Sequence, residues 1–244
     1  MNWLAEHWKT LSLDEEQEGY FFGRGAMEET LDRLQVRTWR CLEDPSPDAT
    51  FRYRYSPKPE YGGKGLGERL EGWALWPLYS PRGRILGFAG RPVPQKEITR
   101  FLLPEAEWQP IFTGLTPQTM ERIWNGADIW VAEGLFDVFA LEWAAPEGTV
   151  VLGSERARLT DKHVEFFRRY ARQPGQRVFM VYDNDETGQK GVDGWTDDTG
   201  KERWGALRRL SRVGVKTVKM TYSGKDPGEV WNQGGAAAVR RTFR

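Results

Sequence analysis

Cysteine and histidine are almost absent from this chain. Its 244 residues include one cysteine, Cys41, and two histidines, His7 and His163. A single cysteine excludes a disulfide framework within the chain and any zinc ribbon or knuckle built on cysteine pairs. With so few nitrogen and sulfur ligands, we predict no structural zinc site.

The chain also lacks long apolar runs and an excess of charge of either sign. No apolar stretch approaches the roughly 20 residues of a membrane-spanning helix, and no signal-peptide core follows Met1. We therefore expect a soluble cytoplasmic protein. Lys and Arg together number 35, as do Asp and Glu, so the formal net charge is zero. Nucleic-acid binding stays open, because it depends on where basic residues gather locally.

The first 120 residues mix helical and extended patterns. The spacing of apolar residues predicts helices over 2–11 and 26–34. Alternation predicts a strand over 51–55, and residues 73–91 are typical of two strands joined by a turn at PRGR. We therefore expect residues 1–120 to form a smaller α+β subdomain.

From residue 121 onward, short apolar runs alternate with helical patterns. The apolar runs are IWVA, TVVLGS, RVFMVY and VKTVKMTY. Thr160 is the predicted N-cap of the helix that follows the second run, and a further helix is predicted over 201–214. This alternation is typical of a parallel sheet with helices on both faces. We therefore predict a Rossmann-like α/β domain over 121–244.

Acidic residues follow three of the predicted parallel strands. Glu133 comes directly after IWVA, Asp183 and Asp185 follow RVFMVY, and Asp226 comes soon after the last strand. Asp137 lies one helical turn beyond Glu133 and faces the same side. Ligands bind at the carboxyl edge of such sheets, and five acids gathered there would repel one another. The sequence therefore predicts a Mg²⁺ site at this edge.

Other roles for the acidic segment DNDETG fit its surroundings less well. It matches the opening of an EF-hand loop, but the twelfth position of that loop is Gly194 instead of an acid, and a strand-like segment precedes it. A lone Asp-x-Asp also occurs in ordinary turns, and Asp226 before Pro227 suits a turn. The presence of all three acidic motifs together, in order, on alternating strand–helix units favours the metal site.

Two of these acidic segments carry a family resemblance. EGLFD (133–137) and DNDETG (183–188) resemble the signature motifs of the TOPRIM domain, which DnaG-type primases, topoisomerases and some nucleases share. The resemblance implies that Glu133 is a metal ligand or general acid/base and that Asp183 and Asp185 bind Mg²⁺. GKDPGE (224–229) resembles the next DnaG-type segment, usually Asp-Pro-Asp, and Gly228 replaces the second aspartate.

Segments of the first half resemble the catalytic core of DnaG-type primases. They are the Arg-Gly helix start within 20–36, WPLYSPRGRILGFAGR at 76–91 and TRFLLPEAEWQPIFTGL at 99–115. The resemblance implies a DNA-dependent RNA polymerase, a nucleotidyltransferase that makes short primers on single-stranded DNA with Mg²⁺ or Mn²⁺. The basic residues expected to contact nucleic acid or NTP are Arg24, Arg91, Arg100, Lys64 and Lys225.

DnaG-type primases usually also carry a zinc-binding module and a helicase-binding domain, and we expect neither in this chain. The expectation is an isolated core, or a compact phage or plasmid protein that works with a replicative helicase in trans, NTPs and an RNA–DNA hybrid. A Mg²⁺-dependent toprim nuclease and a non-catalytic nucleic-acid-binding replication protein remain alternatives. Residues 192–200 are predicted to be an insertion near the site, and its acidic residues are expected to lie in a loop without contributing to the site.

Overall fold

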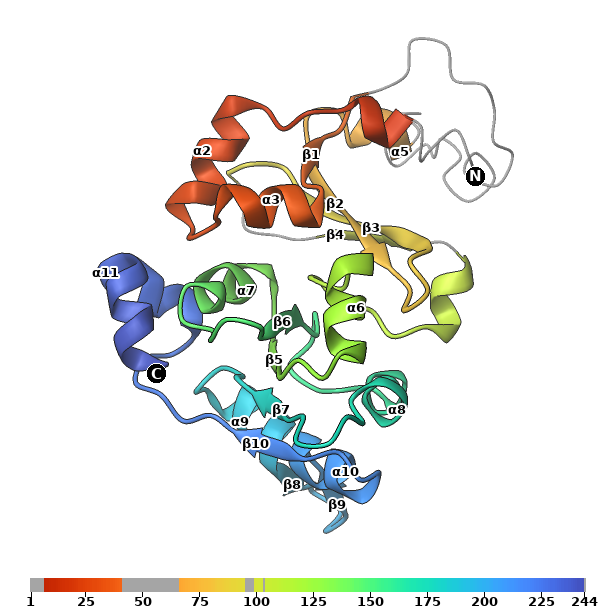
Figure 1. Cartoon of the computed structure of the whole chain (residues 1–244), viewed down its shortest axis with the longest axis vertical. Helices are drawn as coiled ribbons and strands as arrows, with labels where there is room; N and C mark the ends of the chain where they lie inside the picture. The colour runs from red at the N-terminus through yellow and green to blue at the C-terminus, as the bar shows by residue number, and fades with distance from the viewer. Residues whose placement is uncertain (1–6, 41–65, 95–98, 103, 244) are drawn as a thin grey trace.

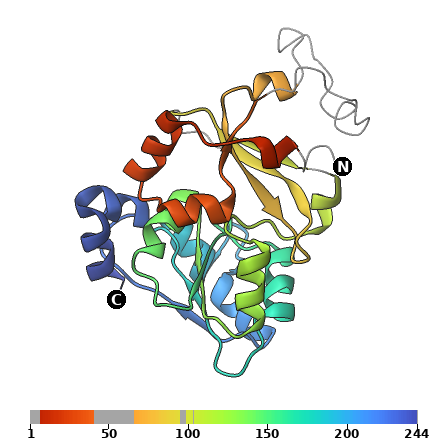
Figure 2. The same ribbon diagram turned by 45° about the horizontal axis from the view of Figure 1, so that its top comes forward.

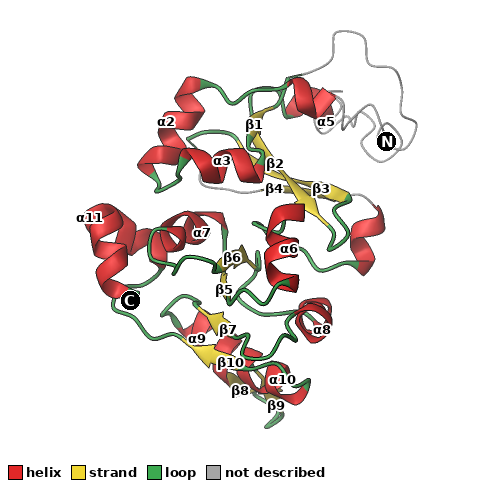
Figure 3. Cartoon of the chain, viewed as in Figure 1, coloured by secondary structure: helices red, strands yellow, loops and turns green. Residues whose placement is uncertain are grey.

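The computed structural model describes residues 7–40, 66–94, 99–102 and 104–243. Figure 1 shows two parts built around separate sheets, with β1 to β4 in the upper part and β5, β6, β7 and β10 in the lower part. Helices accompany both sheets (Figure 3). The predicted architecture, an α+β part followed by a parallel sheet flanked by helices, is confirmed.

An antiparallel sheet organises the N-terminal half. Its strands pair in the order β1-β2-β3-β4. Their bounds are Arg37–Thr38, Ala74–Tyr79, Ile85–Arg91 and Thr99–Leu102. The hairpin predicted over 73–91 is confirmed as β2 and β3, in which Trp76 lies opposite Ala89. Every residue of β2 is buried, because its alternate side chains enter two different cores. The strand predicted over 51–55 lies outside the described residues.

Several short helices accompany this first sheet. They are α2 (Glu15–Gly23), α3 (Glu28–Leu34), α5 (Leu66–Arg69) and the 3-10 helix η2 (Pro104–Trp108). The helix predicted over 26–34 is confirmed as α3. Of the helix predicted over 2–11, the described residues 7–10 are helical. Helix α2 was not predicted, because only Gln17 and Phe21 of that helix are buried and they form no apolar stripe.

A four-stranded parallel sheet organises the C-terminal half, as predicted. Its strand order is β10-β7-β5-β6, and each neighbouring pair is parallel. In that order the bounds are Thr217–Lys219, Val178–Met180, Ile129–Ala132 and Val150–Gly153. Strands β5 and β7 lie side by side at the centre, with Val131 opposite Met180. The residues that follow these two strands therefore meet at one edge.

Helices cover both faces of the parallel sheet. Ile129 and Val131 pack with α6 (Pro117–Trp124), α8 (Asp161–Tyr170) and α10 (Ala206–Arg212). Trp130 and Ala132 pack on the other face with α7 (Leu135–Glu142) and α11 (Pro227–Thr242). The predicted N-cap is confirmed, since the Thr160 hydroxyl accepts a hydrogen bond from the His163 N–H. In the described part of the chain, no helix is long and apolar enough to span a membrane.

Residues 186–204 contain elements that the sequence did not reveal. Helix α9 (Glu186–Asp193) follows the acidic loop, and strands β8 (Gly194–Thr196) and β9 (Glu202–Trp204) form a two-stranded hairpin. The helix predicted over 201–214 was placed too early. It begins at Ala206, because residues 202–204 pair with 194–196 and keep an extended backbone.

The two halves share a core beside the parallel sheet. Phe21, Leu31 and Trp76 from the first half pack with Leu135 and Phe139 of α7. Figures 1 and 2 both show the N-terminal helices next to α7, and the Trp143 indole N–H donates to the Gly25 carbonyl at 2.8 Å. The first half therefore holds the helix that begins just after Glu133. The boundary expected at residue 120 falls within α6, and the assignment of two domains remains a prediction.

Candidate functional site

Glu133 and Asp183 lie next to each other at the carboxyl edge of the parallel sheet. Glu133 follows β5 directly, and Asp183 comes three residues after β7, its neighbour in the sheet. The Asp183 backbone N–H donates to the Glu133 side-chain Oε1 at 3.2 Å. The parallel register thus brings together two acids that are 50 residues apart in the sequence.

This pair has an oxygen atom without a protein partner. The Oδ1 atom of Asp183 is buried and accepts no hydrogen bond. Gly188 closes one side of the pair, because a Cβ atom there would lie 2.3 Å from the Asp183 carbonyl oxygen and 2.7 Å from Glu133 Oε1. Buried carboxylate oxygens without donors are costly unless a cation or proton compensates them. The site therefore fits a hard divalent cation, which prefers such oxygen ligands.

Both carboxyl groups hold protons unusually strongly. Burial, and then the charge of Asp183, raise the pKa of Glu133 to about 7. Burial, and then the charges of Asp226 and Asp185, raise the pKa of Asp183 to about 6. Both shifts come from poor solvation and mutual repulsion of the anions. A bound cation would relieve both causes.

Asp137 connects two loops instead of facing open space. Its Oδ2 accepts from the Gly134 N–H at 3.2 Å, and its Oδ1 accepts from the Gly228 N–H at 3.3 Å. Burial, and then the charge of Asp183, raise its pKa to about 8. Asp137 therefore ties the start of α7 to the start of α11, next to the acidic pair.

Asp185 and Asp226 both cap helices. Asp185 Oδ1 accepts from the Gly188 N–H at 2.9 Å at the start of α9, and Asp226 Oδ1 accepts from the Glu229 N–H at 2.6 Å at the start of α11. The Glu229 carboxylate in turn accepts from the Lys225 N–H at 2.7 Å. Each cap leaves the second oxygen of its aspartate for another contact.

The five predicted acids thus surround one edge but do not form a closed set of ligands. Among the residues that the structure describes, no three acidic, histidine or cysteine side chains are arranged to hold a metal ion. The carboxylates of Glu133, Asp137, Asp185 and Asp226 each accept from a backbone N–H group, and only the Glu133 bond joins two of the five acids. Their assignment as metal ligands therefore remains a proposal.

Two tyrosines beside the acids were missed in the sequence. The Tyr182 hydroxyl lies 2.6 Å from the Ser154 hydroxyl, and the Tyr222 hydroxyl donates to the Tyr182 carbonyl at 3.0 Å. Burial, and then the charges of the nearby carboxylates, raise the pKa of Tyr222. The only sequence signal was that Tyr182 precedes Asp183 and that Tyr222 ends the last apolar run.

Two of the predicted basic residues lie beside α7. Arg91 is only 1% exposed, and its guanidinium lies 4.9 Å from the Phe136 ring centre and 5.2 Å from that of Tyr20. Its Nε atom has no hydrogen-bond partner, and burial lowers its pKa. Arg24 lies 4.5 Å from the centre of the Phe136 ring. Since Phe136 adjoins Asp137, both cations lie close to the acidic edge.

The other predicted basic residues have different surroundings. Arg100 donates to the Glu155 carbonyl at 2.8 Å, and its Nε lies 3.5 Å from the buried Glu155 carboxylate. Arg100 thus joins β4 to the loop after β6. The charge of Lys225 lowers the pKa of Asp183, which places this lysine near the pair. Lys64 lies outside the described residues. Nucleic-acid contacts of all these residues remain a proposal.

The family model described as Toprim-like matches residues 130–230, the part of the chain that contains the parallel sheet and the acidic edge. A DNA primase of Deinococcus radiodurans is 26% identical over 179 residues, which cover 72% of this chain and 28% of that protein. The chain thus spans little more than a quarter of this curated relative.

Solved primase structures share the fold of nearly the whole chain. The zinc-binding and RNA polymerase domains of the Aquifex aeolicus primase match with a TM-score of 0.63 and 18% identity, over 98% of this chain and 60% of that one. The RNA polymerase domain of Mycobacterium tuberculosis DnaG, in complex with double-stranded DNA, matches with a TM-score of 0.62 and 18% identity. This match covers 97% of this chain and 76% of that one. The chain therefore resembles the catalytic core of DnaG-type primases, as its sequence motifs imply.

Proposed function

We propose that this chain is a DNA-dependent RNA polymerase of the DnaG type, a nucleotidyltransferase that makes short primers on single-stranded DNA. The observation that carries the proposal is the pair of Glu133 and Asp183. The Asp183 backbone N–H donates to the Glu133 carboxylate, both side chains have raised pKa values, and the buried Oδ1 of Asp183 accepts no hydrogen bond. They lie on a primase-like fold in a chain that is 26% identical to a DNA primase.

Glu133 and Asp183 would hold Mg²⁺, or Mn²⁺ in its place. Asp185 and Asp226 would add their free oxygens, and Asp137 would position the loops around them. When bound, such ions bring the triphosphate to the site and stabilise the charge that develops on the transferred phosphoryl group. Glu133 is the proposed catalytic residue, because its carboxylate directly follows β5 at the acidic edge and contacts Asp183, where it could accept the proton that the primer 3′-hydroxyl loses.

The ligands follow from this chemistry. The template is single-stranded DNA, the substrates are NTPs, and the product is an RNA–DNA hybrid. Arg24 would contact phosphate near the acidic edge, since its guanidinium lies over the Phe136 ring beside α7. Arg91 is 1% exposed, so it would contact phosphate only if the site opened around it. A replicative helicase acting in trans would supply the single-stranded template.

Incubation with single-stranded DNA, NTPs and Mg²⁺ or Mn²⁺ tests the proposal. New RNA oligomers that depend on both the template and the metal support it. Shortened DNA would identify a nuclease, and a template that shifts in a gel without new products would identify a binding protein. The Glu133→Gln variant should lose about 10²–10⁴-fold of the primer synthesis rate.

A matched variant controls for the loss of a carboxylate as such. Glu165 is a partly exposed acid of α8 that pairs with Arg168 and Arg169. Glu165→Gln should therefore retain wild-type primer synthesis. Wild-type synthesis by Glu133→Gln would contradict the assignment of the site.

A further inference from the structure

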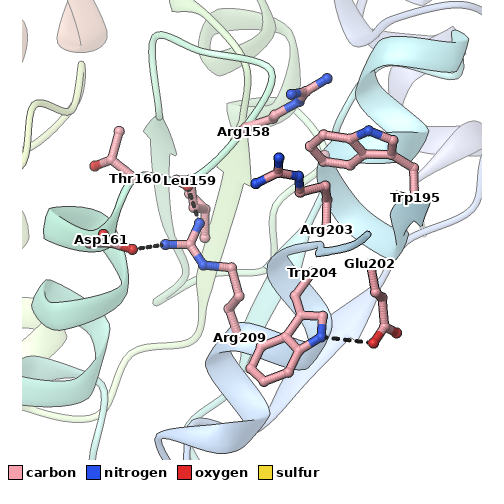
Figure 4. Close-up of a pocket in the computed structure, with 10 residues that line it drawn as sticks. Arg158, Leu159, Thr160, Asp161, Trp195, Glu202, Arg203, Trp204 and Arg209 are labelled. Carbon is pink, nitrogen blue, oxygen red and sulfur yellow. Dashed lines mark hydrogen bonds and ion pairs between the residues drawn. The ribbon is translucent and has the colours of Figure 1, made fainter. Parts of the chain in front are cut away.

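The β8–β9 hairpin forms one wall of a pocket that the proposed chemistry does not use. The pocket has a volume of about 510 Å³ and lies between the hairpin, the loop before α8 and the start of α10. Figure 4 shows Arg158, Arg203 and Arg209 reaching it from these three segments, with the indoles of Trp195 and Trp204 on the hairpin side.

A cationic and aromatic face lies at the centre of this pocket. Trp195 and Arg203 are direct cross-strand partners, so their side chains leave the same face of the hairpin. The Arg158 guanidinium lies 3.9 Å from the centre of the Trp195 ring. Arg158 is exposed and Trp195 is half-buried, so solvent reaches the stacked pair. We call Arg158, Trp195 and Arg203 the hairpin face.

The acids around the pocket form ion pairs with Arg203, Arg208 and Arg209. Asp161 pairs with Arg209 at 2.5 Å, and Glu202 pairs with Arg208. Asp197 pairs with Arg203 at 2.7 Å. Within the described residues, Arg158 has a ring contact but no ion pair. The hairpin face therefore offers one uncompensated cation beside an indole.

Helix α9 connects the hairpin face to the acidic edge. It begins at its N-cap Asp185, and Gly191, six residues later, lines the pocket. At 1.5 Å per residue, the two sites are about 9 Å apart along the helix axis. A Cβ atom at Gly191 would lie 1.8 Å from the Ala157 carbonyl oxygen, so α9 packs tightly against the loop that carries Arg158. The two sites are thus rigidly linked.

We propose that the hairpin face binds a nucleotide unit of single-stranded nucleic acid as the strand passes the acidic edge. Indole rings and guanidinium planes both stack on bases, and an unpaired guanidinium contacts phosphate. The pocket is open to solvent along this face and is large enough for one base with its phosphate. The inference rests on the proposed function for the identity of the strand, which is the template or the growing primer.

Binding of a labelled oligothymidylate, measured by fluorescence anisotropy in metal-free buffer, tests the inference apart from catalysis. The double variant Arg158→Gln with Trp195→Ala should bind about ten-fold more weakly than the wild type, because it loses a stack and a phosphate contact. Arg158→Gln alone should also lower the slope of log K against log salt by about 0.7, the value for one phosphate of a single strand.

Matched controls come from the same half of the molecule. Arg169→Gln removes an exposed cation of α8, and Trp124→Ala removes an indole of α6 that is 49% exposed. Neither residue lines the pocket, so both variants should bind like the wild type. Thermal unfolding should show that Arg158→Gln, which loses only an exposed side chain, is folded like the wild type.

The outcomes separate this inference from the proposed function. If the wild type makes no primers but its oligothymidylate affinity depends on Arg158 and Trp195, the hairpin face stands and the proposed function fails. Primer synthesis with unchanged affinity in the double variant would overturn the hairpin face alone. If the double variant loses affinity for ATP but binds oligothymidylate like the wild type, the inference is also overturned, since the pocket would then take a free nucleotide.

Discussion

The acidic edge and the β8–β9 hairpin contain the same residue types in opposite surroundings. At the edge, Glu133 and Asp183 lie together without an ion pair among the described residues, and burial and repulsion raise their pKa values to about 7 and about 6. In the hairpin, Asp197 accepts from Thr199 and Arg203, which lower its pKa to about 2. Carboxylates that the chain itself neutralises stabilise local structure, whereas those it leaves uncompensated are available to an external cation.

The largest expected difference between the two regions is the effect of replacing a glycine by alanine on primer synthesis. Gly188→Ala would force a Cβ atom against the Asp183 carbonyl and the Glu133 carboxylate. Displacing these groups by an ångström should lower primer synthesis about 100-fold, and overpacking should lower the free energy of unfolding by about 1–3 kcal/mol. Steady-state synthesis and urea unfolding measure the two effects.

Gly200 in the hairpin provides the matched comparison. Gly200→Ala meets no atom within 4 Å, although its φ of 79° strains an alanine backbone. It should therefore cost about 1 kcal/mol of stability and leave primer synthesis unchanged. An equal loss of synthesis in both variants would show that the edge is no more tightly packed than the hairpin.

Asp137 allows a second test of the edge. It accepts two backbone N–H groups through different oxygens, and an asparagine accepts only one of them and points an NH₂ group at the other. Asp137→Asn should therefore destabilise the protein by about 1–3 kcal/mol. Chemical denaturation measures this loss, and unchanged stability would mean that Asp137 does not connect α7 to α11.

The two regions should also respond to pH in opposite directions. Glu133, Asp183 and Asp137 have raised pKa values of about 7, 6 and 8, so the folded state binds more protons than the unfolded state between about pH 4 and 8. In metal-free buffer, stability should therefore fall as the pH rises through this range. Asp197 has a lowered pKa, so its contribution is present above about pH 4 and is lost as the pH falls toward 2.

Urea unfolding at several pH values, with EDTA and with Mg²⁺, measures this dependence. Mg²⁺ should raise the stability most at pH 8, because the cation binds the ionised carboxylates that the folded protein otherwise disfavours. The dependence on pH should then become flatter. A stability that rises from pH 5 to 8 without metal would contradict the raised pKa values.

The sequence predicted the elements whose physics is local or periodic. The continuous apolar runs predicted the parallel strands, and the acids directly after them predicted where Glu133 and Asp183 meet, because parallel strands align their ends. It did not predict α9 or the hairpin. Gly194 and Gly205 make the base of that hairpin, where an added Cβ on Gly205 would lie 2.3 Å from the Gly194 nitrogen, and such a close approach leaves no pattern in the sequence.

The functions of individual acids were equally hidden, because they depend on partners far along the chain. Asp137 was expected to face a metal with Glu133, yet its second partner, Gly228, lies 91 residues away. Arg100 was expected to contact nucleic acid, and the structure pairs it with Glu155, 55 residues away. Residue type and spacing indicate which side chains gather at an edge, but they do not indicate which of them the backbone already engages.

The smallest expected effect is that of Asp197→Asn. The Asp197 carboxylate pairs with Arg203 at 2.7 Å and accepts from the Thr199 and Lys201 N–H groups at 3.0 Å. The amide oxygen can keep the backbone contacts, and ion pairs that water reaches contribute little to stability, so stability and primer synthesis should both remain near wild type. The substitution releases Arg203, however, and the hairpin face should then bind oligothymidylate slightly more tightly, by about two- to three-fold. Weaker binding would show that Asp197 positions Arg203 instead of competing for it.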